Sequence, residues 1–124
     1  MPEPRAFEFK AWVNTPFTLL ARVYDESRTL INQSSVSTIT YKVMDGTGNV
    51  DATGSQTVGS VVFNSLQNDS RWSVDSVGYN FAPVIPSTAI TETGYYQIEM
   101  WITMTSGTSF PVVWRGVCMS LQSH

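Results

Sequence analysis

Hydrophobic and polar residues alternate along most of this chain, which is typical of β-strands that bury one face. The longest alternating run covers residues 95–105. One face of this run carries Tyr96, Ile98, Met100, Ile102 and Met104. The other face carries Tyr95, Gln97, Glu99, Trp101 and Thr103. The pattern predicts one long strand, followed by a short turn at Gly107 and an antiparallel partner strand over residues 109–119.

Shorter runs predict strands over residues 7–13, 18–24, 38–44, 60–66, 72–74 and 79–85, with a short edge strand within residues 50–59. No stretch keeps the apolar spacing of a helix. Pro83 and Pro86 indicate a sheet edge or a strand end, because proline cannot donate to a strand ladder. We therefore predict an all-β sandwich of about seven or eight antiparallel strands.

The composition fits one domain with a surface rich in serine and threonine. The chain has 124 residues, and only 14% of them are charged, against about 25% in an average globular domain. We expect an N-terminal arm and first strand over residues 1–16, a sandwich over residues 17–120 and a C-terminal tail over residues 121–124.

Charge and cysteine usage exclude several classes of partner. The net charge is -3, so the chain lacks the basic surface that nucleic-acid binding requires. Cys118 is the single cysteine, which excludes an internal disulfide and favours synthesis in a reducing cytoplasm. We find no secretion signal or membrane span, and we expect neither a nucleic acid nor a membrane as partner.

A short motif precedes the long strand. The order Glu92-x-Gly94-x-Tyr96-x-Ile98 resembles the tyrosine corner at the penultimate strand of immunoglobulin-like domains. Glu92 stands where that signature has aspartate, and Ile98 stands where it has the disulfide cysteine. The resemblance implies an immunoglobulin-like sandwich without a disulfide.

A second resemblance covers most of residues 17–119. Its residues are Thr18-Leu-Leu-Ala-Arg-Val23, Ile39-Thr-Tyr-Lys-Val43 and the stretch 61–86 with Trp72, Asp75 and Gly78-Tyr-Asn-Phe81. This string is similar to small immunoglobulin-like proteins of bacteriophages and prophages. The resemblance implies a non-enzymatic virion component, such as a capsid decoration, neck or tail protein. It also implies a place in the virion after synthesis in the host cytoplasm, and no cofactor.

Two groups of polar residues are candidates for chemistry. Asp45, Thr47, Asn49 and Asp51 alternate oxygen ligands as calcium loops do, but Asp-Gly and Gly-Asn favour a plain hairpin turn without a metal. Asp69 and Asp75 could act as an acid and a base. We favour a structural loop in which Asp75 caps a turn and pairs with Arg71.

Two other groups are weaker candidates. His124 is terminal and a poor general base. Cys118 lies in an apolar strand and is expected to be buried, with Arg115 on the opposite face.

The aromatic residues carry most of the functional signal. If Tyr96 faces the core, Tyr95 and Trp101 lie on the outer face, where they form an interface or are covered by another segment of the chain. Trp12, Trp72 and Trp114 are expected in the core or in sheet packing.

Open sheet edges favour an assembly. Pro16, Pro83, Pro86 and Pro111 are expected to blunt these edges. We expect an oligomer or lattice-bound subunit whose partners are other virion proteins or copies of itself. The alternative is a carbohydrate- or cell-surface-binding module, and a third option is a small hydrolase that uses Asp69 and Asp75.

Overall fold

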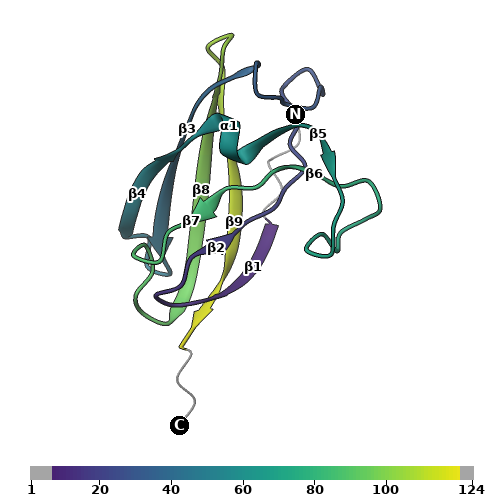
Figure 1. Cartoon of the computed structure of the whole chain (residues 1–124). Coiled ribbons are helices and arrows are strands. Elements are labelled where there is room, and N and C mark those ends of the chain that lie inside the picture. The colour runs from purple at the N-terminus through teal and green to yellow at the C-terminus, as the bar shows by residue number, and fades with distance from the viewer. Residues whose placement is uncertain (1–6, 121–124) are drawn as a thin grey trace.

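The computed structural model describes residues 7–120, which form nine strands and one helical turn (Figure 1). The strands are β1 (Phe7–Trp12), β2 (Phe17–Thr18), β3 (Val36–Asp45), β4 (Val50–Gln56), β5 (Val62–Gln67), β6 (Tyr79–Phe81), β7 (Val84–Ile85), β8 (Gly94–Met104) and β9 (Ser109–Met119). The helix α1 spans Val58–Val61. The predicted all-β class is confirmed, with one or two more strands than the sequence indicates.

Five strands form the larger sheet in the order β1-β9-β8-β3-β4. β8 and β9 form the predicted antiparallel hairpin, with Ile98 opposite Trp114. Gly107 in the connecting turn has a φ of 100°, the left-handed conformation that glycine adopts at little cost. β3 pairs with the other side of β8, with Val43 opposite Ile98, and β4 forms the far edge.

β1 forms the opposite edge and runs parallel to β9, whereas the sequence predicts antiparallel strands only. The two backbones approach closely because Gly116 has no side chain: a Cβ there would collide with the carbonyl oxygen of Phe9. The strand expected beside the N-terminal arm is therefore an edge strand of the sandwich. Residues 1–6 and 121–124, which include the arm, the tail and His124, lie outside the described residues.

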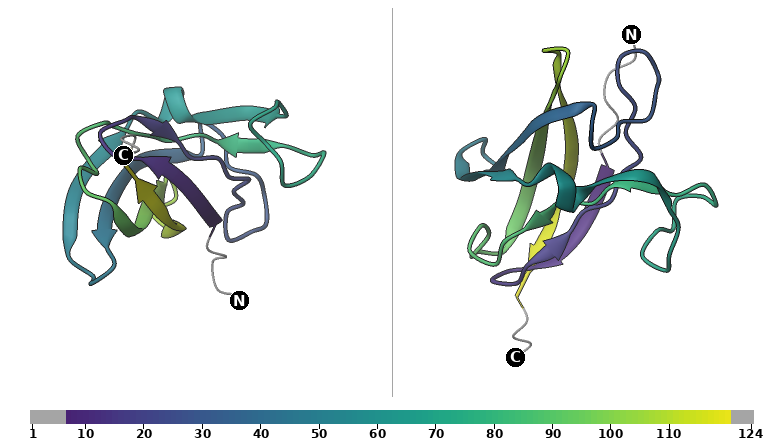
Figure 2. Two further views of the ribbon diagram at one scale, coloured as in Figure 1. Left: turned by 90° about the horizontal axis from the view of Figure 1, so that it is seen from below. Right: turned by 45° about the horizontal axis from the view of Figure 1, so that its top comes forward.

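The second layer consists of two short antiparallel pairs, β2 with β7 and β5 with β6. An isolated bridge between Ala21 and Phe81 joins this layer to the loop after β2. Figure 2 shows this layer on one side of the five-stranded sheet. Its strands are short, and the larger sheet supplies most of the regular structure.

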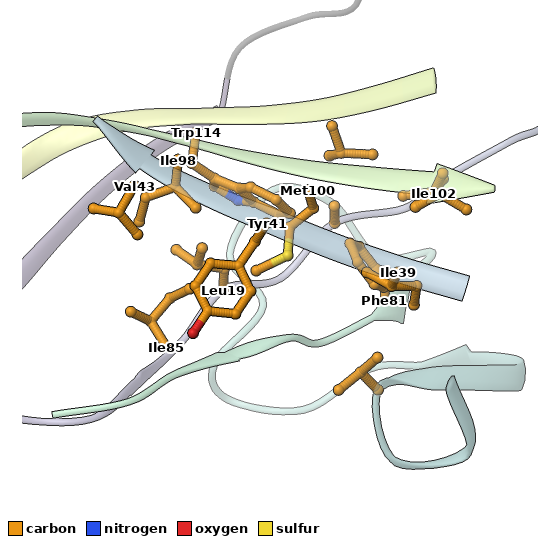
Figure 3. Packing of buried hydrophobic residues seen from close by; sticks show 14 of the residues in the cluster. Leu19, Ile39, Tyr41, Val43, Phe81, Ile85, Ile98, Met100, Ile102 and Trp114 are labelled. Carbon is orange, nitrogen blue, oxygen red and sulfur yellow. The ribbon is translucent and has the colours of Figure 1, made fainter. Parts of the chain in front are cut away.

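The core lies between the layers, and its side chains come from both (Figure 3). Its labelled members are Leu19, Ile39, Tyr41, Val43, Phe81, Ile85, Ile98, Met100, Ile102 and Trp114. Trp114 is almost fully buried and lies against Phe7 and Phe81, with ring centroids 5.8 and 6.0 Å away. Burial of such large side chains stabilises the fold by roughly 2 kcal/mol each.

The strand predicted over residues 18–24 is wrong in extent, since β2 ends at Thr18. Leu19, Ala21 and Val23 are buried as the alternation predicts. Val23 bonds the backbone N–H of Ile31 and also a buried side chain. The buried Asn80 amide accepts from Val23 N at 2.7 Å and donates to Val23 O at 3.1 Å.

The strand predicted over residues 72–74 is wrong, because this segment is part of a loop. Trp72 is buried beside Tyr79 in a small separate cluster, whereas Val74 is exposed. The strand predicted over residues 79–85 is two strands, β6 and β7, on either side of Pro83. The segment over residues 60–66 begins within the helical turn α1 before it continues as β5.

Candidate interaction surface

The strongest candidate surface is the face of the five-stranded sheet that points away from the second layer, which we call the outer face. β8 divides its side chains strictly between the two faces, because successive residues of a strand point in opposite directions. Tyr96, Ile98 and Met100 are buried, whereas Tyr95 is 76% exposed and Trp101 is 37% exposed. In the described structure, therefore, neither outer aromatic side chain is fully covered.

Apolar side chains from β9 extend this surface beside the two aromatic residues. Pro111 lies opposite Trp101, Val113 opposite Glu99, and Val117 opposite Tyr95. None of these three β9 residues is fully buried. The outer face therefore combines aromatic and aliphatic surface on two adjacent strands.

Trp12 adds a third aromatic residue to this face; it was expected in the core or in sheet packing, and the core is wrong. It is 43% exposed and lies opposite Met119 at the end of β1. The sequence holds a signal for this, because Trp12 shares its position in the alternation with the polar residues Glu8 and Lys10. Trp72 and Trp114 are buried, as predicted.

A ladder of hydrogen bonds connects the polar side chains of the outer face. The Arg115 Nε donates to Gln97 Oε1 at 2.8 Å, and the Gln97 amide donates to Glu99 Oε2 at 3.1 Å. The Trp101 indole N–H donates to Glu99 Oε1 at 3.1 Å. Sequence reasoning missed this ladder, although the period-two spacing of residues 97, 99 and 101 places them in one row.

The motif before β8 has the bond expected of a tyrosine corner. The Tyr96 hydroxyl donates to the backbone oxygen of Glu92 at 2.7 Å, and Gly94 between them has a φ of 149°. Burial raises the pKa of the Tyr96 phenol, so this hydroxyl remains a donor. The motif thus anchors the start of β8 and the row of outer residues that begins with Tyr95.

An open hollow of about 260 Å³ lies beside Tyr95. Its walls include Asp45, Gln97 and Arg115. The Asp45 carboxylate is already engaged by the turn between β3 and β4: its Oδ1 accepts from the Thr47 hydroxyl at 2.6 Å and from the Thr47 and Asn49 backbone N–H groups. These bonds, the Thr47 hydroxyl first, lower the pKa of Asp45. The arrangement is the predicted hairpin turn.

Asp75 organises the loop of residues 68–78. Its Oδ1 accepts from the Trp72 indole N–H at 2.9 Å and from the backbone N–H groups of Val77 and Gly78. Its other oxygen lies 2.8 Å from the Arg22 guanidinium. Asp75 caps a turn as predicted, but its partner is Arg22 and not Arg71.

Asp69 has different partners from Asp75. The Tyr79 hydroxyl donates to Asp69 Oδ2 at 2.6 Å, and the Arg71 guanidinium lies 3.3 Å from the same oxygen. Bonds from Tyr79 and then Arg71 lower the pKa of Asp69, and bonds led by the Trp72 indole lower that of Asp75. Neither carboxyl holds a proton near neutral pH, so neither suits the role of general acid.

Cys118 is almost fully buried, and Arg115 is exposed on the opposite face, as predicted. Burial raises the pKa of the Cys118 thiol to about 11. A thiol of this kind acts as a small apolar side chain and is a weak nucleophile near neutral pH.

Among residues 7–120, no group of three or more His, Cys, Asp and Glu side chains is placed to hold a metal ion. In that same part of the chain, no helix has the length and apolar character of a membrane span.

No family model matches the chain, and no curated protein matches it significantly in sequence. Among solved structures, the crystal structure of CopC from Methylosinus trichosporium OB3b is similar, with a TM-score of 0.50 and 8% identity. The match covers 96% of this chain and 88% of that chain. It concerns the fold alone, and it confirms a β-sandwich of the immunoglobulin-like type. The phage resemblance is not tested by these matches and stays a prediction.

Proposed function

We propose that this chain is a non-enzymatic structural component of a phage particle and acts through protein-protein contacts. The observation that carries the contact function is the outer face, on which Trp12, Tyr95 and Trp101 remain exposed beside aliphatic residues of β9. Tyrosine and tryptophan are favoured anchors of protein interfaces. An exposed aromatic face of this kind is a candidate for coverage by a protein partner.

The assignment to a particle rests on the sequence resemblance to phage immunoglobulin-like proteins. The proposed location is therefore the virion, after synthesis in the host cytoplasm. The proposed partners are other virion proteins or copies of this chain, in an oligomer or a lattice. Nucleic acid and membrane are not proposed as partners, and the proposed role needs no cofactor.

The test is to fractionate a lysate of the source on a density gradient and to quantify the chain by mass spectrometry. We expect it to migrate with particles at a fixed ratio to the main shell or tail protein. Recovery only as a free small protein would contradict the proposal.

A second candidate function is a carbohydrate- or cell-surface-binding module. The observation that favours it is the exposed Trp101 ring, whose orientation is held by the bond to Glu99, because aromatic rings on sheet faces also bind sugars. A glycan array tests this candidate. Binding that Trp101→Ala abolishes would support it, and the absence of binding would remove it.

A further inference from the structure

We propose that the outer face binds the same face of a second copy of this chain. The two-fold axis lies in the interface and runs across the strands, along the line that joins the paired residues Ile98 and Trp114, which we call the Ile98–Trp114 row. This inference rests on the proposed contact function and names its partner. An interface between identical copies requires a surface that is complementary to itself after a half turn. The outer residues of β8 and β9 meet this requirement in both their aromatic and their charged positions.

The outer residues of β8 are arranged symmetrically about Ile98. Gln97 and Glu99 lie one residue on either side of it, and Tyr95 and Trp101 lie three residues on either side. A half turn about the row places Tyr95 of one copy over Trp101 of the other, and Gln97 over Glu99. Each contact thus joins an aromatic residue to an aromatic residue, or an amide to a carboxylate.

The neighbouring strand β9 follows the same symmetry about Trp114, which pairs with Ile98. Pro111 of one copy meets Val117 of the other, and Val113 meets the stem of Arg115. The rotation also places Glu99 of the second copy over Gln97, directly beside Arg115 of the first. Opposite charges therefore approach each other across the interface, and no Glu99 faces another Glu99.

The polar ladder favours a protein surface over a hydrogen-bonding ligand. Both oxygens of Glu99 and the Gln97 side-chain oxygen already accept bonds within the chain. Their existing bonds reduce the cost of removing these groups from water. The same bonds restrict the side chains before association, and so they reduce the entropy lost on binding.

The size of the surface sets the strength of the association. From Tyr95 to Trp101 the strand extends about 20 Å; β9, β8 and β3 are about 15 Å wide, and β1 from Phe7 onward widens half of this surface to about 20 Å. The contact therefore buries on the order of 1,000 Å² in total, which is the range of weak complexes. We expect a reversible dimer of the pure protein, strengthened in a particle by high local concentration.

Cross-linking of two cysteine variants tests the arrangement. Tyr95→Cys and Trp101→Cys are purified separately, and each protein is treated with a short bismaleimide alone and after mixing. Facing sheets lie about 10 Å apart, and the native Cys118 is buried. We expect the mixture to give several-fold more cross-linked dimer than either protein alone. Equal or greater cross-linking of Tyr95→Cys alone would contradict the proposed axis.

Sedimentation equilibrium provides the second test. Gln97→Glu places two carboxylates against each other across the interface, so we expect at least a tenfold weaker dimer. Val84→Glu, at an exposed position of β7 in the other layer, is the matched control and should leave the dimer unchanged. Thermal melting verifies that both variants are folded.

The outcomes separate this inference from the proposed function. A wild-type protein that is monomeric at every concentration, or equal effects of Gln97→Glu and Val84→Glu, would overturn the second copy as partner. The proposed function would then still be decided by the particle fractionation. A monomer that binds a glycan through Trp101 would also overturn the inference.

Discussion

At the scale of single residues, Asp75 has the largest set of bonds in the loop of residues 68–78. Its carboxylate connects the Trp72 indole, the turn at Gly78 and the Arg22 guanidinium. We expect Asp75→Asn to lower the melting temperature by several degrees at neutral pH, because the ion pair with Arg22 is lost. Asp51→Asn, at an exposed position of β4, is the control and should melt like the wild type.

Acid should destabilise the protein through the same residue. The pKa of Asp75 is lower in the folded chain than the usual value of about 3.9. The contribution of the Asp75 carboxylate to the free energy of unfolding is therefore complete above about pH 4. It is lost as the pH falls toward the pKa that Asp75 has in the folded chain. Between about pH 6 and about pH 2, the melting temperature should fall less steeply with pH for Asp75→Asn than for the wild type. An equal fall of the melting temperature in both proteins would contradict this account.

The tyrosine corner makes a separate prediction. Tyr96→Phe removes the hydroxyl bond to Glu92 O and keeps the ring in the core. We expect the free energy of unfolding to fall by about 1 kcal/mol, the usual contribution of one such bond. Tyr95→Phe changes the exposed neighbour and should have almost no effect. Chemical denaturation of both variants measures the difference, and equal stabilities would show that the corner bond does not stabilise the fold.

The tryptophan predictions show what sequence can indicate at this scale. The period-two pattern assigns each residue of a strand to one of two faces, and it placed Trp101 correctly on the outer face of β8. Trp12 was expected in the core or in sheet packing, although its own alternation pointed outward. The buried Trp72 lies in a loop, where a periodic pattern carries no information about contacts.

At the scale of elements, the close contact of β1 with β9 depends on Gly116. A methyl group at this position would collide with the backbone of Phe9, and a backbone atom cannot rotate away. We expect Gly116→Ala to lower the free energy of unfolding by at least about 2 kcal/mol. Relative to the wild type, amide hydrogen exchange in this variant should be accelerated more at Lys10 in β1 than at Val43 in β3.

Gly59→Ala is the matched control for this prediction. Gly59 lies in α1, and a Cβ there meets no atom within 4 Å. We expect this variant to retain the wild-type stability to within about 1 kcal/mol. If both glycine variants are equally stable, β1 does not depend on close contact with β9.

The elements differ in how well the sequence predicts them. β8 and β9 were predicted to within one residue of their ends, because both are long and bury one face along their whole length. The segment after β2 was predicted as a strand, but it makes isolated backbone bridges, among them that from Ala21 to Phe81, and its Val23 bonds the Asn80 side chain. The parallel pairing of β1 could not be predicted, because alternation identifies faces and not partners.

At the scale of the whole molecule, the candidate surface follows from the arrangement of two unequal layers. The short strands of the second layer lie on one side of the five-stranded sheet (Figure 2), and the opposite, outer face carries the exposed aromatic residues. The sequence predicted two outer aromatic positions, Tyr95 and Trp101. The hairpin pattern also predicted their neighbours on β9, whereas the place of β1 beside β9 depends on strand order, which only the structure provides.

The exposure of these residues predicts that the surface can be altered without loss of the fold. We expect the double variant Tyr95→Ala/Trp101→Ala to melt within a few degrees of the wild type, because neither side chain belongs to the core. A large loss of stability would show that the two side chains support the sheet itself.

The most direct test of the central claim is the incorporation of this double variant into particles. The variant and the wild type are expressed in trans in the source, and particles purified on a gradient are quantified by mass spectrometry. Val74→Ala/Val77→Ala, at exposed positions of the loop over residues 68–78, is the control. We predict that particles incorporate the wild type and the control at a fixed ratio and largely exclude the double variant. Incorporation of the double variant at the wild-type ratio would contradict a role for the outer face in assembly.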